Sequence, residues 1–166
     1  MLDIARRVTT QAQFIFICGK NQKLAERIRA LKTKYPKHVE GFTAEIPYFM
    51  HLSDFFIGKP GPGSISEALA MRLPVIVERN AWTLPQERYN AEWIREKQVG
   101  VVLKSFREMD DGLRELLDPP NFARFRANAA AIKNRAVFEI PEILDSLLRR
   151  EIRPQPELRL PGTAAS

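Results

Sequence analysis

The sequence is poor in the residues that build disulfides and metal sites: it has one cysteine, Cys18, and two histidines. A single cysteine excludes a disulfide framework within the chain and a zinc site made of several cysteines. No run approaches the roughly 20 apolar residues of a membrane-spanning helix. Residues Met1 to Arg7 also lack the apolar centre of a signal peptide. We therefore expect a cytoplasmic chain without a metal site, with peripheral membrane contact at most.

The length and composition are those of one compact domain. With 166 residues, 45% of them hydrophobic, the chain can build one core but hardly two. We expect a domain over residues 1–150 and a disordered tail over residues 151–166, where prolines are frequent and no period is visible. The sequence contains no internal repeat.

The charge balance is basic, with 26 lysines and arginines against 20 aspartates and glutamates. This surplus suits an anionic partner: a nucleotide sugar, an acidic membrane surface or nucleic acid. The basic residues between Arg124 and Arg135 belong to a helix whose other face is apolar, the usual pattern of a solvated surface, so we expect no specific nucleic acid partner. Arg149 and Arg150 could touch acidic lipid, or they could simply complement the dipole at a helix end.

Short apolar runs alternate with helical patterns over the first hundred residues. We expect strands near residues 14–18, 38–42, 54–58, 74–78 and 100–104. Helices are expected over 24–31, 46–52, 64–72 and 85–97, and then, without further strands, over 107–117, 122–134 and 141–150. This order predicts a Rossmann-like, doubly wound α/β fold with a parallel sheet and C-terminal helices. A helix around Ile4 and Val8 precedes the first expected strand, whereas a doubly wound domain begins with a strand, so we expect the first strand to be lacking.

A glycine-bearing turn, Lys59-Pro60-Gly61-Pro62-Gly63-Ser64, joins an apolar strand to the helix expected over 64–72. Its glycines let backbone amides approach an anion, and the helix directs free N–H groups and its positive dipole end at the same point. The turn therefore predicts a phosphate site. Ser64 and Glu67 also fit a capping box with Ser64 as the N-cap residue, and on this motif alone the capping interpretation is equally good.

A second loop, residues 79–84, follows the apolar strand over 74–78 and leads into a helix that begins with Pro85. In a doubly wound fold, both loops leave the carboxyl edge of neighbouring strands, where ligands bind. Gln86, Glu87 and Asn90 would then bring amide and carboxylate groups beside the phosphate site, a set suited to sugar hydroxyls. Taken in isolation, Glu87 is better explained as part of a solvated first turn.

Several of these motifs, in this order, resemble one family. They are residues 58–69, residues 73–77, Pro85-Gln86-Glu87 with Asn90, and the strand over 14–20 followed by Asn21. Together they resemble the C-terminal donor-binding domain of GT-B glycosyltransferases of the family 28 type, in particular monogalactosyldiacylglycerol synthase-like proteins. The resemblance covers residues 14 to 105.

The resemblance implies roles for the residues that match. Glu67 matches a glutamate that holds both ribose hydroxyls, a task suited to a carboxylate because it can accept two hydrogen bonds. The segment whose backbone amides bind the diphosphate corresponds to Gly61, Gly63, Ser64 and Ile65. The positions that read the hydroxyls of the donor sugar correspond to Gln86, Glu87 and Asn90.

Three further residues, at the ends of the first two expected strands, complete the implied site. Phe42 matches a position that packs on the uracil, although an aromatic residue at a strand end more often belongs to the core. Gly19 and Lys20 match a loop that faces the donor. Lys20 could offset phosphate charge, but an ordinary solvated lysine is the better explanation of this residue alone.

The implied reaction is transfer of a hexose from a UDP-sugar to a lipid or lipid-linked acceptor, without cofactor or metal. Backbone amides, a helix dipole and cations stabilise the leaving diphosphate in such enzymes. A complete enzyme also needs an N-terminal acceptor domain that supplies the general base, and 166 residues leave no room for it. We therefore name no catalytic residue and expect the donor-binding half of an enzyme, completed by an acceptor domain or a separate subunit. The alternative is a non-catalytic nucleotide-binding regulatory or scaffold domain.

Overall fold

The computed structural model describes residues 1–151, so the tail expected over residues 151–166 lies outside them except for Glu151. The chain divides into two compact units, the first over Met1–Lys133 and the second beginning at Asn134. The first unit carries all the strands of the described residues, and the second contains one long helix.

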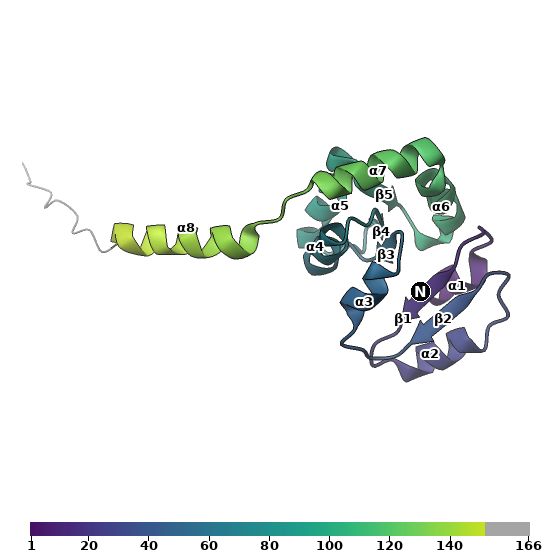
Figure 1. Cartoon of the computed structure of the whole chain (residues 1–166). Helices are drawn as coiled ribbons and strands as arrows, with labels where there is room; N and C mark the ends of the chain where they lie inside the picture. The colour runs from purple at the N-terminus through teal and green to yellow at the C-terminus, as the bar shows by residue number, and fades with distance from the viewer. Residues whose placement is uncertain (152–166) are drawn as a thin grey trace, which may run out of the picture. The chain divides into compact units, whose positions relative to one another are not determined.

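The first unit contains five parallel strands in two sheets (Figure 1). Strands β1 (Phe14–Ile17) and β2 (Lys37–Glu40) pair with Phe14 opposite Lys37. Strands β3 (Phe56–Gly58), β4 (Val75–Glu78) and β5 (Gly100–Leu103) form the second sheet in the order β3-β4-β5. Each strand falls within the range expected from the sequence or within one residue of it, and the predicted α/β fold with parallel strands is confirmed.

Helices alternate with the strands and then follow one another. Those of the first unit are α1 (Leu2–Arg7), α2 (Gln22–Arg29), α3 (Ile46–His51), α4 (Pro62–Ala70), α5 (Pro85–Lys97), the 3-10 turn η1 (Phe106–Glu108), α6 (Met109–Leu117) and α7 (Pro119–Ala131). Helix α2 packs against β2, α4 against β4, and α5 against β4 and β5, while α6 packs against β5 and α7.

The second sheet is covered on both faces, as the side chains of β4 show. Ile76 belongs to an apolar cluster with residues of α1, α2 and α6, whereas Val75 and Val77 belong to a second cluster with residues of α4 and α5. Successive side chains of a strand point to opposite faces, so the two clusters lie on the two sides of the sheet. This is the layered arrangement of a doubly wound, Rossmann-like domain.

Two helix starts differ from the prediction. Helix α4 begins at Pro62 with Gly61 as its N-cap residue, so the prediction of Ser64 as N-cap of a capping box is wrong. A proline fits the first helical position because its φ is already helical and its missing N–H is not needed there. Helix α8 (Ala136–Glu151) begins five residues before Pro141, which lies inside it and not at its start.

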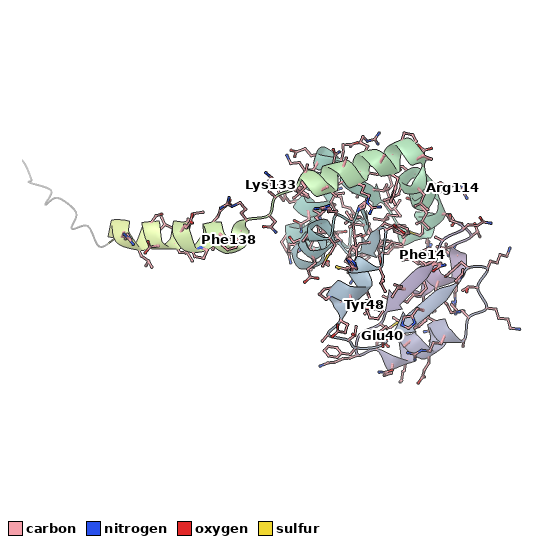
Figure 2. All side chains as sticks on the ribbon, in the orientation of Figure 1. Phe14, Glu40, Tyr48, Arg114, Lys133 and Phe138 are labelled. Atoms are coloured by element: carbon pink, nitrogen blue, oxygen red, sulfur yellow. The ribbon has the colours of Figure 1, made fainter. Side chains whose placement is uncertain are left out.

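The second unit, helix α8, exposes a row of large apolar side chains. More than half of the residue surface is exposed at Phe138, Ile140, Ile143, Leu144 and Leu148, and Figure 2 labels Phe138 on this helix. The ion pair between Arg149 and Asp145 lies within the same helix. Across residues 1–151, no helix combines the length and the apolar character that crossing a membrane requires.

Candidate functional site

The amino end of α4 presents backbone amides without helical acceptors. The first i→i−4 hydrogen bond of this helix runs from the Ile65 N–H to the Gly61 carbonyl oxygen, at 3.2 Å. Gly63 and Ser64 precede it in the first turn, where backbone N–H groups have no partner in the helix. The Ser64 hydroxyl lies 3.3 Å from the same Gly61 oxygen, so it is turned toward the preceding loop. Ile65 is buried and its amide is already bonded, which leaves the amides of Gly63 and Ser64 as the donors of this turn without a partner in the helix.

Glu67 lies one turn further along α4 and is exposed. Because the helix begins at Pro62, Glu67 is its sixth residue and lies beyond the first turn, where a capping-box glutamate would have to be. The alternative that Glu67 serves in a capping box at the start of α4 is therefore excluded. An exposed carboxylate on the first two turns of α4 can accept hydrogen bonds from a ligand held at the helix start.

The first turns of α5 touch the loop that leads into α4. The Asn90 side chain donates through Nδ2 to the Pro60 carbonyl oxygen, at 2.8 Å. A side chain at Gly61 would place its Cβ 3.9 Å from Glu87 Oε1, so this carboxylate lies against the glycine. The contact joins residues 30 positions apart in sequence and holds the α4 loop beside α5. Gln86 is exposed on the same turn.

The loop before α5 is held by hydrogen bonds that were not predicted from the sequence. Asn80 accepts the Trp82 N–H through Oδ1 and donates its own N–H to the Thr83 hydroxyl, each at 2.9 Å. Arg88 in α5 donates to the carbonyl oxygens of Ala81 and Thr83. Asparagine followed by threonine three residues later is typical of such a turn, and this signal could have indicated a fixed loop. The turn leaves Trp82 92% exposed.

A second group of residues lies at the ends of β1 and β2. The Gly19 N–H donates to the Gly41 carbonyl oxygen at 3.1 Å, and Gly19 has a φ of +56°, which favours glycine. Lys20 Nζ lies 5.6 Å from the centre of the Phe42 ring. Phe42 is 70% exposed, so the alternative that it belongs to the core is wrong. An exposed aromatic face beside a lysine is suited to a flat, negatively charged ligand.

The carboxylate of Glu40 fixes the loop that carries Phe42. The Gly41 N–H donates to Glu40 Oε1 at 2.9 Å, and this bond, together with the His38 side chain, lowers the pKa of Glu40. Between this group and the group at α4 and α5, no hydrogen bond or ion pair is formed within residues 1–151. Over the same residues, no three or more His, Cys, Asp or Glu side chains gather in a way that could hold a metal ion.

The comparisons with known proteins point to one family of enzymes. The chain is 34% identical over 143 residues to the chloroplast monogalactosyldiacylglycerol synthase of Spinacia oleracea, covering 84% of this chain and 27% of that protein. It is 32% identical over 142 residues to monogalactosyldiacylglycerol synthase 1 of Arabidopsis thaliana, covering 84% of this chain and 26% of that protein. The chain therefore spans about a quarter of the length of these relatives.

The fold comparison agrees. The structure is similar to that of spinosyn forosaminyltransferase SpnP, with a TM-score of 0.52 over 87% of this chain and 45% of that one. At 17% identity, this likeness shows the fold alone, a glycosyltransferase fold of the GT-B type. The model of the glycosyltransferase family 28 C-terminal domain matches residues 1–145. The chain belongs to the glycosyltransferase family 28 C-terminal domain family.

Proposed function

We propose that this chain is the donor-binding part of a hexosyltransferase that uses a UDP-sugar and a lipid or lipid-linked acceptor. The family supports glycosyl transfer, and the names of the relatives, monogalactosyldiacylglycerol synthases, support a sugar donor and a diacylglycerol-type acceptor. The observation that carries the proposal is the contact of α5 with the α4 loop, through Asn90 and Pro60.

That contact supports a site in which backbone amides at the start of α4 lie beside carboxylate and amide side chains of α5. The amides of Gly63 and Ser64 and the dipole of α4 would bind the diphosphate. Glu87 lies against Gly61, next to this position, and would accept hydrogen bonds from hydroxyls of the donor sugar together with Gln86. During transfer, negative charge grows on the leaving diphosphate, and fixed amides stabilise that charge without having to reorganise.

The other two parts of the donor would be held by Glu67 and by the group around Phe42. Glu67 is exposed and would accept both ribose hydroxyls. Phe42 would stack on the uracil, and Lys20, beside its ring, would add positive charge near the phosphates together with the loop at Gly19.

Calorimetric titration of the 166-residue chain with UDP tests the donor site. We expect binding, and we expect Glu67→Ala to weaken it about tenfold or more, since one hydrogen bond to a charged group contributes about 1.5–3 kcal/mol. Glu115→Ala is the matched control, because Glu115 is also exposed but lies on α6. Inorganic pyrophosphate lacks the ribose, so its affinity should be equal in all three proteins. A folded chain that gives no heat with UDP would contradict the proposal.

Glycosyl transfer itself requires a second test, because the proposed general base and acceptor site lie in an acceptor domain or separate subunit. The chain alone should bind UDP without transferring sugar. Co-expression with an acceptor domain from one of the relatives, followed by a transfer assay with UDP-galactose and diacylglycerol, should yield product only when both parts are present. Binding without transfer in every such combination would favour the non-catalytic regulatory or scaffold alternative.

A further inference from the structure

The positive charge of the chain is concentrated in its first 40 residues. Residues 1–40 contain nine lysines and arginines against three aspartates and glutamates, whereas residues 41–166 contain 17 of each kind. The first 40 residues therefore carry the whole formal net charge of +6. They comprise α1, β1, α2 and β2, so the surplus belongs to one part of the first unit.

Helices α1 and α2 direct basic residues away from the core. Ile4 and Ala5 of α1 and Ala25 and Ile28 of α2 belong to one buried apolar cluster, and the two helices contact each other. The sides of these helices that are turned away from the cluster are exposed, as is much of the loop after α2. The exposed basic residues on them, which we call the α1–α2 basic face, are Arg6, Arg7, Lys23, Arg27, Lys32 and Lys34.

The charges of this face are not neutralised by neighbouring carboxylates. Among the side chains that the structure describes, the ion pairs all involve other residues. Asp3 and Glu26 are exposed on the same helices, but neither forms an ion pair with the face. By contrast, Arg29 and Lys37 of the same region each donate a hydrogen bond to a backbone carbonyl oxygen. The six residues of the face are therefore available to an external partner.

The chemistry of the face favours a broad anionic surface as that partner. Like charges without partners repel one another, and an extended negative surface relieves this repulsion. Apart from Met1, the large apolar side chains that are exposed within residues 1–151 begin at Phe42, so the face has no aromatic ring on which single-stranded bases could stack. Each helix packs along its side against the core, unlike a helix that projects into a DNA groove.

From these observations we propose that the α1–α2 basic face docks on a membrane surface that contains anionic phospholipids. The choice of a membrane rests on the proposed function, in which the acceptor is a lipid. Lysine and arginine reach the phosphates of the headgroups while their stems cover the surface beneath, and each such residue strengthens binding about fivefold. This surface differs from Arg149 and Arg150, which the sequence alone suggests for contact with acidic lipid.

Co-sedimentation of the 166-residue chain with lipid vesicles tests the proposal. One set of vesicles consists of phosphatidylcholine alone, and the other contains phosphatidylglycerol as well. We expect binding to the anionic vesicles and little to the neutral ones. Raising the salt from about 0.05 M to about 0.5 M should release the chain, because salt screens exposed charges.

Two triple variants with the same change in net charge locate the surface. Lys23→Gln, Arg27→Gln and Lys34→Gln together should lower the partition coefficient on anionic vesicles about hundredfold. Lys104→Gln, Arg107→Gln and Lys133→Gln together form the matched control, because these residues are also exposed but lie outside the face. The control should bind nearly as well as the original chain. Since all six substitutions are at exposed positions, circular dichroism should show both variants folded.

Four results would overturn the proposal. The first is equal binding to neutral and anionic vesicles, and the second is an equal loss in the two triple variants, since net charge alone would then explain binding. The third is a loss produced by Arg149→Gln with Arg150→Gln and not by the variant of the basic face. The fourth is a chain that ignores both kinds of vesicle but binds a short RNA or DNA duplex through the same face.

This test can be separated from that of the donor site. The vesicle measurements contain no UDP, so a donor site that fails to bind would leave their outcome unchanged. Conversely, the triple variant of the basic face should bind UDP as tightly as the original chain, because Lys20 of the proposed donor site remains in place. A parallel loss of UDP binding in this variant would also contradict the proposal, because the face would then belong to the donor site.

Discussion

The two sheets are built from similar apolar residues but are supported differently. β4 has a partner on each edge and helices on each face, and Val75, Ile76 and Val77 are all 0% exposed. β1 has one partner, and its alternate residues Ile15 and Ile17 remain half-buried. The difference shows that an apolar strand becomes fully buried only where both its edges and both its faces are covered.

The sheets also differ in how many ladders of backbone hydrogen bonds hold them together. Two ladders join β3, β4 and β5, whereas a single ladder joins β1 and β2. The segment that enters β1 is attached by a side chain: Asp110, at the start of α6, accepts hydrogen bonds from the backbone N–H and hydroxyl groups of Thr9 and Thr10. The two-stranded sheet should therefore be the more easily loosened of the two.

Substitution of Gly100 would break the three-stranded sheet. A Cβ at this position would overlap the Val75 carbonyl oxygen and lie 2.8 Å from the backbone N and C of the same residue. A main-chain clash between two buried, paired strands cannot be relieved by a side-chain movement. We expect Gly100→Ala to lower the free energy of unfolding by more than about 4 kcal/mol, measured by urea denaturation.

Gly63→Ala is the control for that variant, because a Cβ at Gly63 meets nothing within 4 Å and the residue lies in α4. Alanine favours a helix over glycine, so the control should be neutral or more stable by up to about 1 kcal/mol. Equal stabilities for the two variants would mean that β4 and β5 are not packed as closely as the structure has them.

Truncation of one isoleucine in each sheet measures the difference between the sheets directly. Ile76 is completely buried in β4, so Ile76→Ala should cost about 2–5 kcal/mol of unfolding free energy. Ile17→Ala in β1 should cost about 1 kcal/mol, since this side chain is already half in water. Equal losses in urea denaturation would contradict the comparison.

The contrast between the sheets also explains which elements the sequence predicts well. Val75-Ile76-Val77 is a continuous apolar run, which is typical of a strand buried on both faces, and β4 was predicted within one residue. The predicted range of α5 is correct at both ends because Pro85 fits a first helical position. By contrast, Ser64 and Glu67 satisfy a local capping pattern, but Gly61 and Pro62 begin the helix earlier.

From the sequence, the candidate site could be predicted only where the order of the strands alone determines which loops lie together. The order of the strands placed the loops at Gly61 and Glu87 together, and the structure brings them into contact. The bond between Asn90 and Pro60 depends on the side-chain packing of residues far apart in sequence, which no local pattern specifies. The exposure of Phe42 could not be predicted either, because an aromatic residue after a strand has the same local sequence whether it faces the core or the solvent.

The smallest expected effect concerns the attachment of β1 through Asp110. Burial by itself raises the pKa of Asp110, but the hydrogen bonds from Thr9 and Thr10 outweigh it and hold the pKa below the ordinary aspartate value. A lowered pKa in the folded state means that the ionised carboxylate stabilises the fold at neutral pH. This contribution is lost as the pH falls from the ordinary aspartate value, about 4, through the lower pKa of the folded protein.

Asp110→Asn should therefore cost on the order of 1 kcal/mol of unfolding free energy at pH 7, because solvent around the carboxylate screens part of its hydrogen bonding. The loss should shrink as the pH is lowered below about 4, since both proteins then lack the charge. Asp111→Asn is the matched control: Asp111 is the next residue along α6 and makes an exposed ion pair with Arg114, so its loss should be close to zero at every pH. Urea denaturation at several pH values measures both variants. A constant difference between Asp110→Asn and the original chain from pH 7 to pH 3 would mean that the charge of Asp110 does not attach the β1 segment to α6.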